Sequence, residues 1–115
     1  MTMTFEEICR ISGVCSNKFA LANNASIEEI SDNAYEKLKL IVKVLNDGWK
    51  PNWADSTQYK HYPYFKLNDG KFYCYKYGSY ANGPVVGSRL VYKTKELAEF
   101  AVENFIDIYN CYLDY

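Results

Sequence analysis

Residues 62–77 read YPYFKLNDGKFYCYKY, and this stretch decides the fold. Two runs rich in aromatic residues, 62–67 and 71–77, flank Asn68-Asp69-Gly70. Aromatic residues favour strands, and an Asp-Gly pair between two such runs is a strong signal for a tight turn. The stretch therefore predicts an antiparallel β-hairpin.

The length of the turn decides which side chains share a face of the hairpin. With Asp69-Gly70 as the turn, Leu67 opposes Phe72 and Phe65 opposes Cys74, so these four side chains face the core. A three-residue loop would mix apolar and polar residues on both faces, and we therefore favour the two-residue turn. The opposite face would then carry the aromatic and basic residues Tyr62, Tyr64, Lys66, Tyr73, Tyr75 and Tyr77.

A short helix is predicted near the N-terminus. Thr4-Phe5-Glu6-Glu7 has the form of a capping box, in which the first and fourth side chains each bond the backbone N–H of the other residue. The helix should end near Ser12-Gly13 and bury its Phe5, Ile8 and Cys9 side. Residues 14–25 contain Asn and Ser residues that favour a loop, and they are expected to be irregular.

A longer helix is predicted before the hairpin. Ser26-Ile27-Glu28-Glu29 and Asn33-Ala34-Tyr35-Glu36 have the form of two further capping boxes. The strongest apolar periodicity runs from about Ala34 to Asn46, and Asn46-Asp47-Gly48 provides a stop. We therefore expect the main helix to begin near Ala34.

After the hairpin, a loop over 78–84, a third strand over Val85–Tyr92 and a final helix over about Lys95–Leu113 are predicted, with Thr94 as the helix cap. The acidic residues of this helix form one narrow stripe, and nearly all other positions are apolar. Such a helix must be covered over most of its circumference, by the N-terminal helices or by a second subunit. Lys39 and Lys43 are the expected basic neighbours of the stripe.

These elements predict an α+β fold of N-terminal helices, a three-stranded antiparallel sheet and a long C-terminal helix packed on it. A chain of 115 residues, 49% of them hydrophobic, fits one domain with a real core. We expect a helical region over 1–33 and a helix–sheet–helix core over 34–115.

The sequence lacks the features that send a chain to or across a membrane. No basic segment followed by an apolar run opens the chain, and no apolar stretch approaches the roughly 18 residues of a membrane span. The four cysteines include no CxxC pair and are expected to be free thiols, mostly buried. These observations predict a cytoplasmic protein.

Charge is unevenly distributed along the chain. Six acidic against two basic residues give residues 1–36 a net charge of −4, eleven basic against three acidic residues give 37–95 a charge of +8, and 96–115 carry −5. Such asymmetry is found in proteins that bind polyanions. The alternative, which we favour, is that acidic and basic elements neutralise each other within the fold.

Known catalytic motifs of hydrolases, kinases and nucleotide-binding proteins are absent from the sequence. His61 is the only histidine, and a dyad with Cys74 or Cys9 would need partners that meet only in space. Zinc sites favour closely spaced Cys or Cys/His pairs, and there are none. We therefore expect neither an enzyme nor a cofactor or metal.

Four segments together resemble a family of small uncharacterised proteins encoded by phages and prophages of gut bacteria. They are Asn46–Trp53 (NDGWKPNW), Tyr62–Phe65 (YPYF), Val86–Leu90 (VGSRL) and Glu96–Ala101 (ELAEFA). The likeness spans about residues 34–112, and Tyr64 stands where a Trp is expected. It implies a phage origin and work in an infected cytoplasm, and it carries no catalytic residue.

Two functions compete for the basic, tyrosine-rich face of the hairpin. The first is a non-enzymatic phage accessory protein that binds another protein, such as a host factor, and self-associates, because tyrosine is common at interfaces. The second is a single-stranded nucleic-acid-binding protein, since bases stack on aromatic side chains beside cations. The predicted binding face comprises Tyr62, Tyr64, Lys66, Tyr73, Tyr75, Tyr77 and Arg89.

Overall fold

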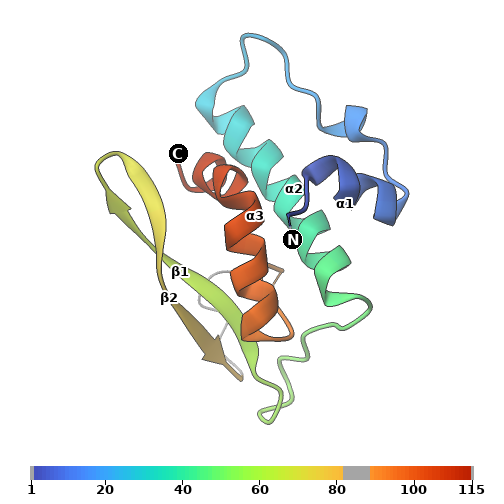
Figure 1. Cartoon of the computed structure of the whole chain (residues 1–115), viewed down its shortest axis with the longest axis vertical. Coiled ribbons are helices and arrows are strands. Elements are labelled where there is room, and N and C mark those ends of the chain that lie inside the picture. The colour runs from blue at the N-terminus through green and yellow to red at the C-terminus, as the bar shows by residue number, and fades with distance from the viewer. Residues whose placement is uncertain (1, 82–88, 115) are drawn as a thin grey trace.

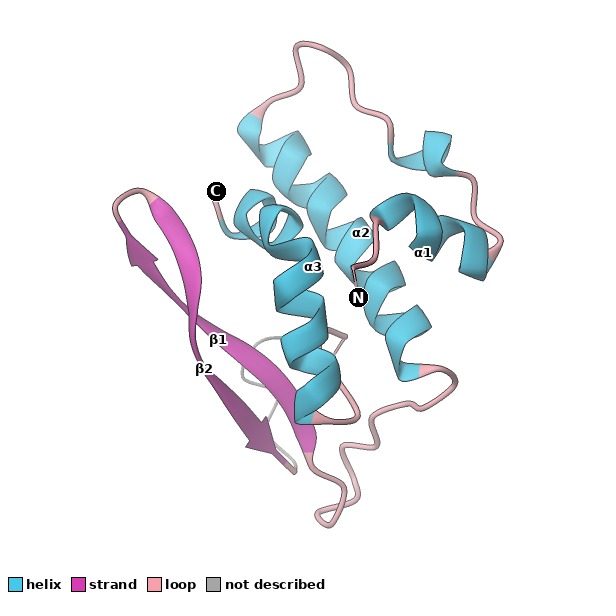
Figure 2. Cartoon of the chain, viewed as in Figure 1, coloured by secondary structure: helices cyan, strands magenta, loops and turns pink. Residues whose placement is uncertain are grey.

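A computed structural model describes residues 2–81 and 89–114 of the chain. The described residues form an α+β fold with three α-helices and an antiparallel hairpin (Figures 1 and 2). In chain order the elements are α1 (Phe5–Ser12), a 3₁₀ turn (Ser16–Phe19), α2 (Ile27–Asn46), β1 (Lys60–Asn68), β2 (Lys71–Tyr80) and α3 (Lys95–Leu113).

Helix α3 occupies the middle of the molecule. Figure 1 shows the hairpin on one side of α3 and α2 on the other, with α1 packed against α2 on the side away from the hairpin. The core fills the spaces between these layers. Its fully enclosed side chains come from all three helices and from the segment before α3, and they include Ile8, Leu38, Ile41, Leu90, Tyr92, Ala98, Ala101, Phe105 and Tyr109.

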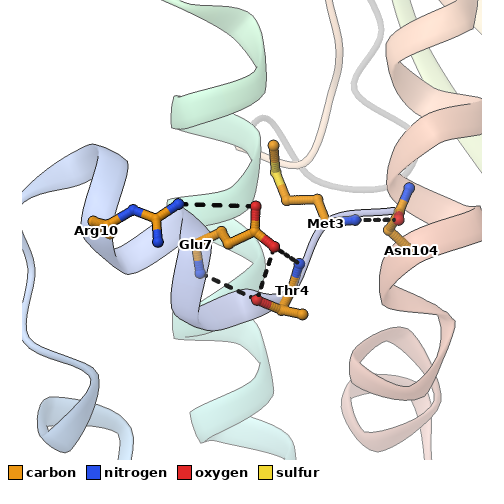
Figure 3. Close-up of polar contacts among 5 residues, drawn as sticks. All are labelled: Met3, Thr4, Glu7, Arg10 and Asn104. Atoms are coloured by element: carbon orange, nitrogen blue, oxygen red, sulfur yellow. Dashed lines mark hydrogen bonds and ion pairs between the residues drawn. The ribbon is translucent and has the colours of Figure 1, made fainter. Parts of the chain in front are cut away.

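The capping box at Thr4 is confirmed. Thr4 Oγ1 accepts a hydrogen bond from the Glu7 N–H at 3.3 Å, and Glu7 Oε1 accepts one from the Thr4 N–H at 3.4 Å (Figure 3). The residue before the cap is also fixed, because the Met3 N–H donates to Asn104 Oδ1 of α3 at 2.7 Å. These contacts anchor the start of the chain and leave Ile8 and Cys9 buried, as predicted.

Helix α2 is one continuous helix that begins at Ile27, so the prediction that the main helix starts near Ala34 is wrong. The Ser26 capping box, in which Ser26 and Glu29 bond each other, forms its start. Asn33 lies inside the helix and its Nδ2 donates to the Phe19 carbonyl oxygen at 3.1 Å. The side chain that resembles a cap therefore serves a tertiary contact.

The hairpin has the predicted register. Asp69 (φ 54°) and Gly70 (φ 80°) form the turn, Leu67 pairs with Phe72, and Phe65 pairs with Cys74. Positive φ at both turn residues matches the twist of the flanking strands. Beyond Phe65 the register shifts, because Tyr64 pairs with Lys76 and leaves Tyr75 as an extra, bulged residue.

The described residues contain two strands, and the described part of the predicted third strand contributes a single bridge. Residues 85–88 of the predicted strand lie outside the described part of the chain. Within 89–92 only Tyr92 pairs with β1, exchanging hydrogen bonds with His61 at 2.7 and 2.9 Å. The predicted loop from residue 78 is also corrected, since β2 continues to Tyr80.

Helix α3 has the predicted bounds and its Thr94 cap, and it is kinked at Phe105. None of the large hydrophobic side chains that are exposed in the described residues belongs to α3. The hairpin and α2 thus cover its apolar surface. Lys39 does not neutralise the acidic stripe of α3, because it pairs with Glu36 of its own helix at 2.9 Å.

No helix in residues 2–81 and 89–114 is long and apolar enough to cross a bilayer. All four cysteines are free thiols, but Cys15 and Cys111 are exposed, so the expectation of mostly buried cysteines is wrong.

Candidate binding face on the hairpin

The face of the hairpin that points away from α3 carries a cluster of exposed aromatic and basic side chains. We call it the outer hairpin face, and it comprises Tyr64, Lys66, Tyr73, Tyr75, Lys76 and Tyr80. Four of the seven residues predicted for the binding face, Tyr64, Lys66, Tyr73 and Tyr75, lie together here. Tyr64 and Tyr75 are 41% and 52% exposed, which is high for residues in paired strands.

Aromatic rings and lysines alternate across this face. The Tyr64 and Tyr75 ring centroids are 6.2 Å apart and tilted by 60°. Lys66 Nζ lies 3.7 Å from the Tyr75 centroid and Lys76 Nζ 5.5 Å from that of Tyr64. Exposed cation–π contacts of this kind contribute about 0.5–1 kcal/mol each, so they orient the side chains while leaving them open to a partner.

The bulge at Tyr75 explains why the outer face is larger than predicted. Because two consecutive residues of β2 oppose one residue of β1, Tyr75 and Lys76 are both exposed. Simple alternation along β2 assigns Lys76 to the core face. Tyr80 was missed for a different reason, since it falls in the segment predicted as loop.

Tyr62 is buried and is not available to a partner. Its ring stacks on that of Tyr80 at a centroid distance of 5.9 Å and lies over Gly78, its partner on β2. Burial, followed by the nearby Tyr80 and Tyr64, raises the pKa of Tyr62. This side chain packs beside Tyr80 at the edge of the outer hairpin face.

Tyr77 points to the core side of the hairpin, so its assignment to the binding face is wrong. The bulge shifts the alternation of β2, and the Tyr77 ring packs against the core cluster. Its pKa is raised chiefly by burial, with further contributions from Cys74 and from Glu99 and Glu103 of α3.

Arg89 lies away from the outer hairpin face. It lines a groove with Trp49 and with Lys39 and Lys43 of α2. The prediction that Arg89 and the hairpin tyrosines form one surface is therefore wrong. Arg89 and the hairpin tyrosines belong to the same basic segment of the sequence, but the fold directs them to different surfaces.

Leu67 is predicted to face the core, but it is 62% exposed. It sits next to the turn, and Figure 1 shows this tip of the hairpin splayed away from α3. Leu67 shares a face of the hairpin with Phe65 and Phe72, opposite to the face of the tyrosines, and it is exposed because it lies at the tip. Phe65, closer to the middle of β1, does face the core, with its ring centroid 4.9 Å from that of Tyr109.

A fully buried lysine holds the loop that precedes the hairpin. Lys60 has no exposed surface, and its Nζ donates to three backbone carbonyl oxygens, those of Asn52, Asp55 and Ala81. The same Nζ lies 5.0 Å from the centroid of Trp53. This anchor fixes residues 50–58 at the end of the hairpin, and no local pattern in the sequence predicts it.

Within the described ranges, no three His, Cys, Asp or Glu side chains come together in a way that could hold a metal ion. His61 is half-buried, and its backbone N–H and carbonyl groups bridge to Tyr92. Comparison of the chain with protein-family models, curated proteins and solved structures finds no match. The resemblance to a phage family therefore stays a prediction.

Proposed function

We propose that this chain is a non-enzymatic phage accessory protein that binds another protein through the outer hairpin face, in the cytoplasm of the infected cell. The observation that carries the proposal is the exposure of Tyr64, Tyr73, Tyr75 and Tyr80 on one face of the hairpin. Contiguous exposed aromatic surface is characteristic of interaction sites.

The composition of the face indicates the chemistry of the partner. Lys66 and Lys76 lie among the tyrosines, and Lys71 follows the turn. A partner surface that combines carboxylates with apolar side chains would pair with both components. Tyr and Lys side chains can bury their apolar parts while their polar ends reach acceptors.

Nucleic-acid binding on this face is supported less well than protein binding. Lys66 already lies over the Tyr75 ring, and Arg89 is not on the face. A single-stranded nucleic acid that stacked a base on Tyr75 would have to displace Lys66 from the ring.

Self-association is part of the same proposal, and it would not use the apolar surface of α3. The apolar surface of α3 that suggested a second subunit is covered by α2 and the hairpin. The outer hairpin face remains the surface through which two copies could meet. Light scattering over a wide concentration range tests this, and a strict monomer would remove self-association from the proposal.

The experiment for the proposal compares capture from infected host cells by three forms of the full chain. The double variant Tyr64→Ala/Tyr75→Ala should lose a partner that the unmodified chain retains. The control is Tyr59→Ala, which removes an equally exposed tyrosine outside the outer face. Loss of capture by the control alone, or retention of every partner by the double variant, contradicts the proposal.

A further inference from the structure

A groove of about 450 Å³ lies between the C-terminal half of α2, the loop that follows it and the segment before α3. Four basic residues line this groove, and none of its lining residues is acidic. The lining includes Lys39 and Lys43 from α2, Trp49 and Lys50 from the loop, and Arg89. Basic side chains from three separate segments thus line the same groove.

We propose that this groove binds a nucleotide ligand with at least two phosphates, either a nucleoside polyphosphate or a short single-stranded nucleic acid. The proposal concerns residues distinct from the outer hairpin face and does not depend on the function proposed for that face.

The charge of the groove favours an anionic ligand. Lys39 pairs with Glu36, but among the described residues no ion pair engages Lys43, Lys50 or Arg89. These three cations line a groove that has no acidic lining residue, so an anion bound there would gain Coulomb energy. Because several cations converge, a ligand with more than one phosphate fits better than a single-charged anion.

The lining of the groove combines aromatic and apolar side chains with the basic ones. Trp49 is half-buried at the groove, and the apolar side chains of Val42 and Pro51 contribute to its walls. Indole rings offer a stacking surface to any base, and cations beside such rings hold the backbone phosphates of single strands. A nucleotide supplies both the planar base and the anion.

A buried residue, Asn46, holds the groove in shape. Asn46 is 4% exposed, its Nδ2 donates to the Val91 carbonyl oxygen at 3.0 Å, and its Oδ1 accepts from the Lys93 N–H at 2.9 Å. The Asn46 carbonyl oxygen also accepts from the Trp49 N–H at 3.0 Å. One side chain and its backbone thus join the walls that carry Trp49 and Arg89, so binding would require little ordering of the groove.

The test uses the full chain and two probes, ATP and a fluorescently labelled oligodeoxythymidine. The groove variant Lys43→Glu/Arg89→Glu is compared with the hairpin variant Lys66→Glu/Lys76→Glu, which makes the same change in net charge. Both groove positions are exposed, so the groove variant should fold. We expect at least one probe to bind, and the groove variant to weaken that binding by about tenfold or more while the hairpin variant changes it much less.

The two probes distinguish the source of the phosphates. Comparable ATP binding points to a free nucleotide, and binding of the oligonucleotide alone points to a nucleic acid. For the oligonucleotide, the slope of log affinity against log salt should fall by about 0.7 for each phosphate that the groove variant no longer neutralises. The proposal is overturned if neither probe binds, if both variants weaken binding equally, or if only the hairpin variant does. The last outcome would instead place nucleic acid on the outer hairpin face.

Discussion

The Nζ atom of Lys60 lies 5.0 Å from the centre of the Trp53 ring, in a position where the lysine is completely enclosed by protein. Lys60 Nζ donates hydrogen bonds to three backbone carbonyl oxygens. Two of them, those of Asn52 and Asp55, belong to the preceding loop, and the third is that of Ala81, just after β2. A buried Lys is costly unless its donors are all bonded. This contact therefore determines whether residues 50–58 stay folded against the hairpin.

Replacing Lys60 with Met should lower the free energy of unfolding by about 2–4 kcal/mol, because it removes three hydrogen bonds from a charged donor and leaves their acceptors without it. Urea denaturation measures the loss of stability. Lys93→Met, at an exposed site, is the control and should change stability by no more than about 0.5 kcal/mol. Equal stabilities for the two variants would mean that the carbonyl contacts contribute nothing.

Lys60→Met should destabilise residues 50–58 more than the rest of the fold. Hydrogen exchange in residues 50–58 is expected to accelerate in Lys60→Met more than exchange in α2, because the lysine links this loop to the end of β2 through its three hydrogen bonds. Uniform acceleration across the chain would contradict a local anchor.

Two buried tyrosines form a second coupled pair. The hydroxyl oxygens of Tyr92 and Tyr109 are 2.7 Å apart inside the core. Tyr109→Phe leaves the Tyr92 hydroxyl buried without this partner and should cost about 1–3 kcal/mol. The double change to Phe removes both polar groups and should cost less than the two single changes together. A double-mutant cycle measured by denaturation gives the coupling energy, and strict additivity would show that the two hydroxyls do not interact.

The tyrosine pair also predicts how stability depends on alkaline pH. Burial raises the pKa of both Tyr92 and Tyr109 above the ordinary value of 10.0. At pH values well below this, both side chains are protonated in the folded and unfolded states, so their contribution is fully present. At higher pH the unfolded chain releases these protons while the folded chain retains them, and stability falls as pH rises. Phe at both positions should flatten this decline, as followed by denaturation at a series of pH values.

Much of the fold was predictable because its signals are local. The capping residues Thr4 and Thr94, the bounds of α3 and the hairpin register around Asp69-Gly70 all depend on residues close in sequence. In each case the hydrogen bonds or the alternation of apolar side chains are set within a few positions.

The failures arise where a residue serves a distant partner. Asn33 resembles a helix cap but bonds Phe19, and Lys60 resembles a surface lysine but bonds carbonyl oxygens from three places. The bulge at Tyr75 cannot be recognised in the sequence, because tyrosines lie on both faces of β2. The sequence therefore predicts the kinds of residue on the binding face, aromatic and basic, but it assigns Tyr77 and Arg89 to the wrong surface.

The close approach of Tyr62 to Gly78 gives a test of how the outer hairpin face is supported. A Cβ atom at residue 78 would lie 2.6 Å from Cζ and Oη of Tyr62, so the ring would have to move from its stack on Tyr80. Gly78→Ala should therefore lower the free energy of unfolding by about 1–3 kcal/mol. In a Tyr62→Ala background the same change should cost little, because the obstructing ring is gone. If Gly78→Ala is equally costly in both backgrounds, backbone conformation and not the Tyr62 ring is what requires glycine at this position.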